Sequence, residues 1–225
     1  MWDESKRYAI VFNGEIFNFQ SLRQDLERQG VSFFSQSDTE VLLKLYIREG
    51  SACLNKLNGF FAFCIYDRSD QSFFLARDRF GVKPLLYLID DDKFLFASEM
   101  KAMIEYGISR AMSPAALHSY FQLNYIPAPL TVFEQVRKLM PGHCMTVRHG
   151  SVSQERYYEI PYDSTRLVTT GYQEASHQLE ALLETAVQRR LVADVPVGSF
   201  LSGGIDSSVI SALASRHHPD LQTFS

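Results

Sequence analysis

A short apolar run that ends in glycines and hydroxyl residues is the feature that most constrains this chain. Residues 198–208 read Gly-Ser-Phe-Leu-Ser-Gly-Gly-Ile-Asp-Ser-Ser, and a helical pattern follows them. Glycines let the backbone approach an anion closely and direct consecutive N–H groups at it. The N-terminus of a following helix adds positive potential. The order of strand, loop and helix therefore predicts a phosphate-binding turn at the start of a parallel α/β sheet.

The specificity of this motif separates two interpretations. A bare Ser-Gly-Gly would be typical of a tight structural turn between a strand and a helix. The loop has no Gly-Lys-[Ser/Thr], so it is not a Walker loop. The full Ser-Gly-Gly-Ile-Asp-Ser-Ser, after Val-Pro-Val-Gly-Ser-Phe-Leu, instead resembles the pyrophosphate loop of ATP pyrophosphatases. We therefore favour nucleotide binding over a purely structural turn.

Composition narrows the class of protein. The 225 residues are 46% hydrophobic, which is ample for a core, and the net charge of −4 argues against a general nucleic-acid or membrane surface. The sequence contains no apolar run long enough for a transmembrane helix and no apolar signal core near Met1. Cys53, Cys64 and Cys144 are odd in number and lack metal-ligand spacing. They indicate reduced thiols in a cytoplasmic protein.

The first part of the chain, residues 1–160, predicts a layered antiparallel domain. Apolar runs indicate five strands before residue 98, and they follow one another as hairpins, at 8–12, 60–66, 72–76, 85–89 and 94–97. Asn13-Gly14 would end the first strand as a turn. Helices are expected at 19–29, 98–106 and 113–123. A further helix is expected to begin at a cap formed by Ser37 or Asp38. Strands that are apolar on both faces favour an αββα sandwich.

The second part, residues 161–225, predicts the beginning of a parallel α/β domain. A hairpin of 144–147 with 151–157 closes the first domain, and a linker follows. A long helix at 171–192 precedes a buried strand at 195–201, the nucleotide loop, and a helix from Ser207. The chain ends in what we expect to be the next strand. We therefore expect the second domain to continue beyond residue 225.

Four further segments complete a family resemblance. They are Asn13-Gly14-Glu15-Ile16-Phe17-Asn18, Ser35-Gln36-Ser37-Asp38-Thr39-Glu40, the run from Ala76 to Leu85, and Phe96-Ala97-Ser98-Glu99-Met100-Lys101-Ala102. With the nucleotide loop behind them, they resemble the glutamine-hydrolysing asparagine synthetases. That family joins a class II glutamine amidotransferase domain, with an Ntn-hydrolase-like fold, to an ATP-pyrophosphatase synthetase domain.

The resemblance implies an activity and its partners. The reaction would convert aspartate, glutamine, ATP and water into asparagine, glutamate, AMP and pyrophosphate. It is a ligase reaction of asparagine biosynthesis, in which ammonia from glutamine attacks an aspartyl adenylate. Mg²⁺ would accompany ATP, and we expect no nucleic-acid or membrane partner. The whole protein is expected to be a cytoplasmic homodimer.

The resemblance also implies roles for residues of the first domain. The Asn13 side chain and the Gly14 backbone N–H would form an oxyanion hole, which acyl transfer from an amide requires. Asp38 would bind the α-ammonium of glutamine, and Glu15 lies in the glutamine-contacting segment. The structural alternatives are a hairpin turn at Asn13-Gly14 and a helix cap at Asp38. Residues 77–79 are expected to support the domain without a catalytic role.

In the second domain, the same resemblance implies a set of contacts with ATP and pyrophosphate. These residues are Leu201, Ser202, Gly203, Gly204, Asp206, Ser207 and Ser208. Asp206 is also a candidate Mg²⁺ ligand, because the metal would offset the charge of the triphosphate.

The chain departs from the family at its start. The family places a nucleophilic cysteine directly after the initiator methionine, whereas Trp2 stands here. We therefore expect a chain that is incomplete at both ends, inactive by itself in both half-reactions, and exposed along sheet edges. Three other interpretations stay open. They are an amidotransferase acting on another carboxylate in a polysaccharide or antibiotic pathway, a non-catalytic glutamine- or nucleotide-binding protein, and a cyclase similar to beta-lactam synthetase.

Overall fold

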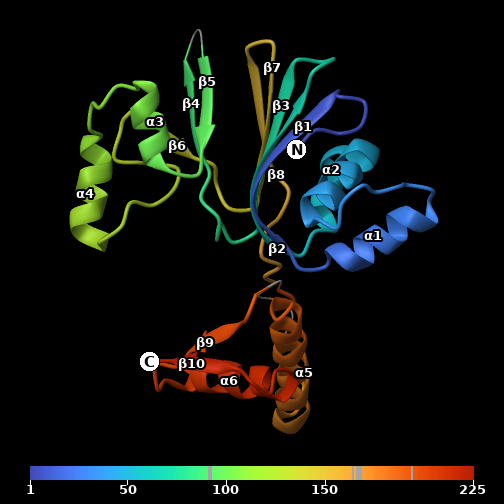
Figure 1. Ribbon diagram of the computed structural model, residues 1–225. Coiled ribbons are helices and arrows are strands. Elements are labelled where there is room, and N and C mark those ends of the chain that lie inside the picture. The colour runs from blue at the N-terminus through green and yellow to red at the C-terminus, as the bar shows by residue number, and fades with distance from the viewer. Residues whose placement is uncertain (91–92, 164, 166–168, 194) are drawn as a thin grey trace. The chain divides into compact units, whose positions relative to one another are not determined.

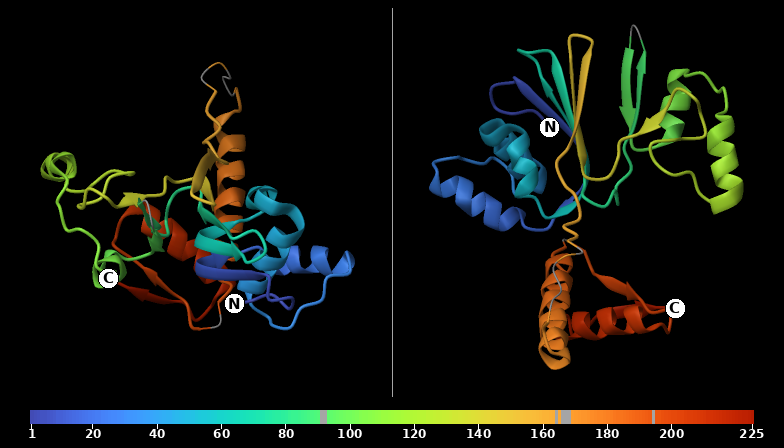
Figure 2. Two further views of the ribbon diagram at one scale, coloured as in Figure 1. Left: turned by 90° about the horizontal axis from the view of Figure 1, so that it is seen from above. Right: turned by 180° about the vertical axis from the view of Figure 1, so that it is seen from behind.

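The computed structural model describes residues 1–225 except 91–92, 164, 166–168 and 194 (Figure 1). The described chain divides into two compact units, Met1–Ile160 and Pro161–Ser225. Figure 2 gives two further views of the elements within each unit. Among the described residues, no helix has both the length and the apolar character that crossing a membrane requires.

Two antiparallel sheets form the first unit. The larger has the order β1-β2-β3-β7-β8, with bounds Tyr8–Ile16, Gly59–Asp67, Ser72–Arg77, His143–Arg148 and Ser151–Arg156. The smaller has the order β5-β4-β6, with bounds Lys93–Ala97, Leu86–Asp90 and Arg137–Lys138. All five strands predicted before residue 98 are present. The predicted turn at Asp90-Asp91-Asp92 lies partly outside the described residues.

Helices flank both sheets. Those beside the larger sheet are α1 (Phe19–Arg28), α2 (Asp38–Glu49) and the 3₁₀ helix η1 (Gly50–Asn55), and those beside the smaller sheet are α3 (Met100–Tyr106) and α4 (Pro114–Leu123) (Figure 1). The Ser113 side chain caps α4 by accepting a hydrogen bond from the backbone N–H of Ala116, with Pro114 in the first turn. This cap is the one that the sequence predicts.

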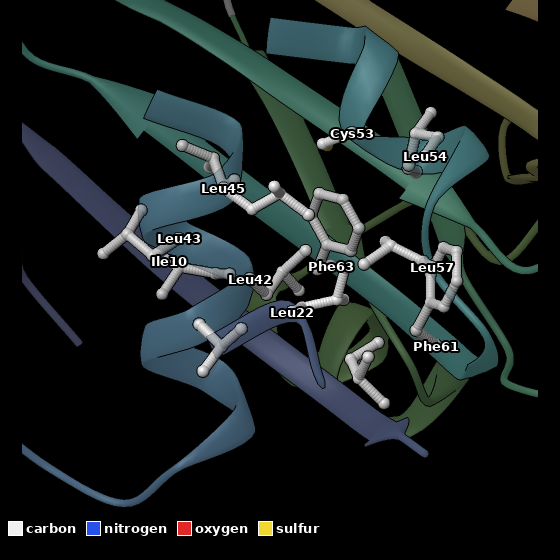
Figure 3. Close-up of a cluster of buried hydrophobic side chains, with 14 of the residues drawn as sticks. Ile10, Leu22, Leu42, Leu43, Leu45, Cys53, Leu54, Leu57, Phe61 and Phe63 are labelled. Carbon is white, nitrogen blue, oxygen red and sulfur yellow. The ribbon is translucent and has the colours of Figure 1, made fainter. Parts of the chain in front are cut away.

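Three hydrophobic clusters mark the interfaces between the layers. The first packs α1, α2 and η1 against the larger sheet (Figure 3). The second lies between the two sheets and includes Cys64, Leu75 and Leu85. The third joins the smaller sheet to α3 through Leu86, Leu88 and Met103. The order of layers is therefore helix, sheet, sheet, helix, and the predicted αββα sandwich is confirmed.

The interior strand β2 is buried on both faces. Phe61, Phe63 and Ile65 belong to the cluster beneath the helices, whereas Ala62 and Cys64 belong to the cluster between the sheets. Successive side chains of a strand point to opposite faces, so an apolar run without alternation must be covered on both sides. The continuous run Phe-Phe-Ala-Phe-Cys-Ile satisfies this requirement.

One predicted turn is wrong. Asn13 and Gly14 do not end the first strand, because β1 continues to Ile16 and pairs with β2 throughout. A Cβ placed on Gly14 would lie 2.2 Å from the carbonyl oxygen of Phe60 and 2.7 Å from the Cα of Phe61. The glycine is therefore required by a close approach of two strand backbones, and not by a reversal of the chain.

The second unit is a small α/β assembly. It contains α5 (Tyr172–Arg190), β9 (Gly198–Phe200), α6 (Ile205–His217) and β10 (Gln222–Phe224). Strands β9 and β10 pair in parallel, with Gly198 opposite Gln222. A cluster that includes Val187, Leu213 and Ala214 holds α5 and α6 together. The predicted start of a parallel α/β sheet is confirmed.

The prediction of a buried strand at 195–201 is wrong in its length and its burial. The strand covers only Gly198–Phe200, and the side chains of Val195 and Phe200 are 70% and 84% exposed. Within the described residues, β9 pairs with a single strand, and Val195 before it and Phe200 at its end have little to pack against. Apolar character predicted burial here, but burial also needs a neighbouring layer.

Truncation of the core side chain of Phe63 should destabilise the first unit strongly. Phe63 is fully buried between Phe61 and Phe74, and Phe→Ala substitutions in cores cost about 3–5 kcal/mol. Denaturant unfolding can be followed through Trp2, the single tryptophan, which lies in this unit. The matched control is Phe121→Ala, whose side chain is 80% exposed. Equal unfolding midpoints for the two variants would contradict the layered core.

Candidate functional site

The outer edge of β1 is occupied at both ends of the strand. The Met1 ammonium donates to the Ile10 carbonyl, and the Ile10 N–H donates to the Met1 carbonyl, both at 2.8 Å. Farther along, the Ile16 N–H donates to Asp38 Oδ2 at 3.0 Å. Alternate N–H groups of a strand point to the same side. The Gly14 N–H therefore points to this same outer edge, between the two occupied positions.

Asn13 faces the second sheet. Its Nδ2 donates a hydrogen bond to Ser98 Oγ at 2.9 Å. Both side chains line a cavity of about 110 Å³ between the two sheets. Asn13 is opposite Ala62 in the β1–β2 ladder, which places its side chain on the inter-sheet face of the larger sheet. The amide group and the Gly14 N–H thus belong to adjacent residues of one rigid strand.

Asp38 reaches the same end of β1 from the first turn of α2. Ser37 is the N-cap of that helix, since its hydroxyl accepts the Thr39 N–H at 3.1 Å. The cap left open between Ser37 and Asp38 is therefore Ser37, and the Asp38 carboxylate is directed to Ile16 instead. Glu15, beside it on β1, is exposed. The structure brings the four predicted residues of the first domain to one end of one strand.

A buried carboxylate supports the segment before Asp38. Glu40 is fully buried, and its carboxylate accepts hydrogen bonds from the Phe34 N–H, the Ser35 N–H and the Ser35 hydroxyl at 2.6–2.9 Å. Burial alone would raise the pKa of Glu40, but these hydrogen bonds and Lys44 hold it below its ordinary value. Sequence reasoning assigned no role to Glu40. The sequence feature that could have indicated its role is the position of a carboxylate directly before an apolar helical run.

Two further charged residues, Arg77 and Asp78, support the connection between the two sheets. The Asp78 carboxylate is buried and accepts backbone N–H groups from Phe61, Phe80, Val82 and Lys83. The Arg77 guanidinium donates to the carbonyls of Gly81, Lys83 and Leu139. Burial lowers the pKa of Arg77 from its ordinary value. These contacts are structural, which agrees with the supporting role expected for residues 77–79.

The three cysteine thiols have low reactivity in this fold. All three are free and buried. Burial raises the pKa of Cys53 to about 12 and that of Cys144 to about 11, and it raises the pKa of Cys64 further. Thiols with such pKa values are protonated near neutral pH and are poor nucleophiles.

The glycine-rich loop of residues 201–204 follows β9 and leads into α6. Gly203 has φ +79°, and no atom lies within 4 Å of a Cβ placed on it. Gly204 is the N-cap residue of α6, and its carbonyl accepts hydrogen bonds from the hydroxyls of Ser207 and Ser208 at 3.1 and 2.8 Å. The Ser202 and Ser207 hydroxyls are 3.1 Å apart. The loop is thus ordered by its own hydroxyl groups and leaves open space in front of Gly203.

The base of the loop is tied to the neighbouring strand, because the Leu201 N–H donates to the Phe224 carbonyl at 2.7 Å. Asp206 is exposed in the first turn of α6. Among the described residues, no group of three or more potential metal ligands comes together. The loop thus offers Mg²⁺ one carboxylate, that of Asp206, rather than a set of protein ligands. This ion is usually bound by one or two carboxylates, with phosphate oxygens and water as its other ligands. The loop, with a helix N-terminus and an accessible glycine, fits a phosphate chain.

Comparisons with known proteins identify the family of this chain. The family described as glutamine amidotransferase domain matches residues 1–158. This chain belongs to that family. The family described as asparagine synthase matches residues 178–225. The chain thus covers an amidotransferase domain and the start of a synthetase domain, and the resemblance to glutamine-hydrolysing asparagine synthetases is confirmed.

Several curated relatives carry that description. Asparagine synthetase [glutamine-hydrolyzing] 1 of Bacillus subtilis (strain 168) is 39% identical over 99% of this chain and 35% of its own length. Asparagine synthetase [glutamine-hydrolyzing] 2 of Arabidopsis thaliana is 34% identical over 96% of this chain and 32% of its own length. This chain therefore spans about a third of the length of these relatives.

Among solved structures, a glutamine phosphoribosylpyrophosphate amidotransferase from B. subtilis superposes with a TM-score of 0.52 at 20% identity. The match covers 100% of this chain and 47% of that one. At this level of identity, the likeness supports the fold alone.

Acidification should test the role of Glu40. Because its folded pKa is lowered, its stabilising contribution is present above its unfolded pKa of 4.5 and is lost as the pH falls through the lower folded value. Glu40→Gln should therefore destabilise the first unit at pH 7 by about 1–3 kcal/mol, the usual worth of hydrogen bonds to a charged group. The difference in unfolding midpoint between Glu40→Gln and the unsubstituted chain should become smaller below pH 4.5. The exposed Glu105 offers a control, Glu105→Gln, which should show no such difference.

Proposed function

We propose that this chain provides the glutamine site and the ATP loop of a glutamine-hydrolysing asparagine synthetase. The reaction is the ATP-dependent transfer of the glutamine amide nitrogen to aspartate, which yields asparagine, glutamate, AMP and pyrophosphate. Residues 1–160 are the proposed amidotransferase domain, and residues 161–225 are the proposed start of the synthetase domain. Family membership and the grouping of polar groups at the end of β1 support this proposal.

The observation that carries the proposal is the hydrogen bond between Asp38 and the Ile16 N–H. It fixes a carboxylate at the strand edge to which the Gly14 N–H also points. Glutamine has an amide carbonyl at one end and an α-ammonium at the other. The proposed glutamine contacts are therefore a carboxylate, Asp38, for the ammonium and two donors, Asn13 Nδ2 and the Gly14 N–H, for the carbonyl. Glu15 is proposed as a further contact.

The oxyanion role follows from what hydrolysis of an amide requires. Negative charge develops on the amide oxygen in the tetrahedral intermediate, and donors that are already oriented stabilise it most. Asn13 and Gly14 lie on a strand that the β1–β2 ladder and the close contact with Phe60 hold rigid. The nucleophile would be the N-terminal cysteine of the family, because the three buried cysteines here have raised pKa values. Glutamine binding is therefore the property to test on these residues.

The nucleotide half of the proposal rests on the loop from Leu201 to Ser208. Gly203, Gly204 and the N-terminus of α6 can direct backbone N–H groups at pyrophosphate, and the Ser202 hydroxyl adds a donor. The Ser207 and Ser208 hydroxyls, which donate to the Gly204 carbonyl in this structure, would turn from it to a phosphate oxygen when the nucleotide binds. Mg²⁺, when bound, offsets the charge of the phosphates, and Asp206 is its proposed protein ligand. Asparagine as the product, rather than another amide, is supported by the names of the relatives.

Glutamine binding should depend on the charge of Asp38. Asp38→Asn keeps an oxygen that can accept the Ile16 N–H but removes the anion for the α-ammonium. Hydrogen bonds to charged groups are worth about 1.5–3 kcal/mol, so the Kd for glutamine should rise about 10- to 100-fold. Calorimetric titration of residues 1–225 measures it, with Asp25→Asn on the exposed face of α1 as the control. A Kd that Asp38→Asn leaves unchanged would argue against this glutamine site.

Adenylation should depend on the open space in front of Gly203. In Gly203→Val the side chain would both strain a backbone at φ +79° and fill the path of the phosphates. The measurement is aspartate-dependent exchange between ATP and pyrophosphate, with the product of the complete reading frame that contains these residues. We expect a fall of at least about 100-fold, as for other displacements of reacting groups. Ser215→Ala, at the far end of α6, is the control. Exchange supported by a different carboxylate, and not by aspartate, would reassign the acceptor.

A further inference from the structure

We infer that Ser98 is a positioning residue for glutamine hydrolysis, because it orients the Asn13 amide toward the developing oxyanion. The inference rests on the proposed function and adds a residue to it. Ser98 Oγ accepts a hydrogen bond from Asn13 Nδ2 at 2.9 Å. The contact joins residues 85 positions apart in the sequence.

The contact crosses from one sheet to the other. Asn13 lies on β1 of the larger sheet, and Ser98 follows β5 of the smaller sheet directly. Strand β5 is fixed by its ladder with β4, in which Ala97 is opposite Leu86. The backbone then turns into α3, whose N-cap residue is Glu99. The hydroxyl of Ser98 is therefore held in place by elements that do not include β1.

The surroundings of the contact are mostly apolar. The cavity shared by Asn13 and Ser98 is otherwise lined by Val11, Ala62, Phe63, Cys64, Leu85, Phe96 and Ala97. In such surroundings an amide N–H gains most from a hydroxyl partner, because leaving a polar group without one is costly. Among these lining residues, Ser98 is the one whose hydroxyl can meet that need.

The chemistry of the amide explains why this matters for catalysis. An Asn side chain has two N–H donors. When Ser98 accepts one of them, the plane of the amide is set, and the second N–H has a fixed direction in which to donate. A donor that needs no reorientation when charge develops stabilises the transition state more than the bound substrate. Loss of Ser98 should therefore lower kcat and leave KM nearly unchanged.

The structural part of the inference can be tested by NMR on residues 1–225. In the unsubstituted chain, the Nδ2 proton of Asn13 that Ser98 accepts should resonate downfield of the shift of a solvent-exposed amide and should exchange slowly with solvent. In Ser98→Ala this proton should move upfield toward the exposed-amide shift, and its exchange should accelerate. Ser98→Thr retains a hydroxyl and should restore the original signals, whereas Ser119→Ala on α4 should not change them. Asn13 signals that are the same in Ser98→Ala as in the unsubstituted chain would overturn the inference.

The catalytic part needs glutaminase kinetics with the product of the complete reading frame. Removing an oxyanion donor costs about 10²–10³ in kcat, so loss of its positioning partner should cost less, about 10-fold. Ser98→Thr should recover most of the rate. In an Asn13→Ala background, Ser98→Ala should have no further effect, because the two residues act through one amide. Three results would each overturn the inference. They are losses in the two single variants that add up in the double variant, a Ser98→Ala variant in which only KM rises, and a Ser98→Ala variant with an unchanged kcat.

Failure of the proposed function gives a different result. In that case the unsubstituted protein would not hydrolyse glutamine, and glutamine binding would not respond to Asp38→Asn. If binding responds to Asp38 while Ser98→Ala changes neither kcat nor the Asn13 signals, the function stands and the role of Ser98 is refuted. Should Ser98→Ala fail to fold, Ser98→Cys, which leaves no space unfilled but weakens the acceptor, decides by the same two measurements.

Discussion

The burial of β2 on both faces is the constraint on which the rest of the first unit depends. One face of this strand packs against α1, α2 and η1, and the other packs against the second sheet. The side chains of this strand that face the helices are large, Phe61 and Phe63, and those that face the second sheet are small, Ala62 and Cys64. The strand thus contributes buried apolar side chains to both hydrophobic layers at once.

The candidate glutamine site is built on the strand next to it. One edge of β1 forms the ladder with β2. The polar groups of β1 that could contact glutamine therefore lie on its other edge or on its inter-sheet face. Gly14 and Asp38 use that edge, and Asn13 uses that face. The rigidity that the proposed oxyanion stabilisation requires would therefore come from the core rather than from a loop.

Much of this architecture could be predicted from the sequence, because it depends on local patterns. Apolar runs located the strands, and Ser113-Pro114 located the start of α4. Asn13-Gly14 was misread as a turn, because glycine serves equally in a turn and in a close strand contact, and only the partner strand distinguishes them. The exposure of Phe200 was missed for a similar reason, since burial depends on neighbours that a local pattern does not contain.

The candidate site was predicted unevenly. Its residues were proposed from motifs, but the contacts that orient them could not be. Asp38 could be a cap or a ligand from sequence alone, and its hydrogen bond to Ile16 became visible only in three dimensions. Ser98 was part of a recognised segment, yet its partner lies 85 residues away. Long-range hydrogen bonds of this kind leave no periodic signal in a sequence.

The connection from β3 to β4 joins the two sheets. The charges of Asp78 and Arg77 are each met by backbone groups of that connection and its surroundings, rather than by an exposed ion pair. Mobile ions screen buried backbone contacts far less than they screen charges on a surface. The separation of the sheets, and with it the reach from Asn13 to Ser98, is thereby insulated from the ionic strength of the medium.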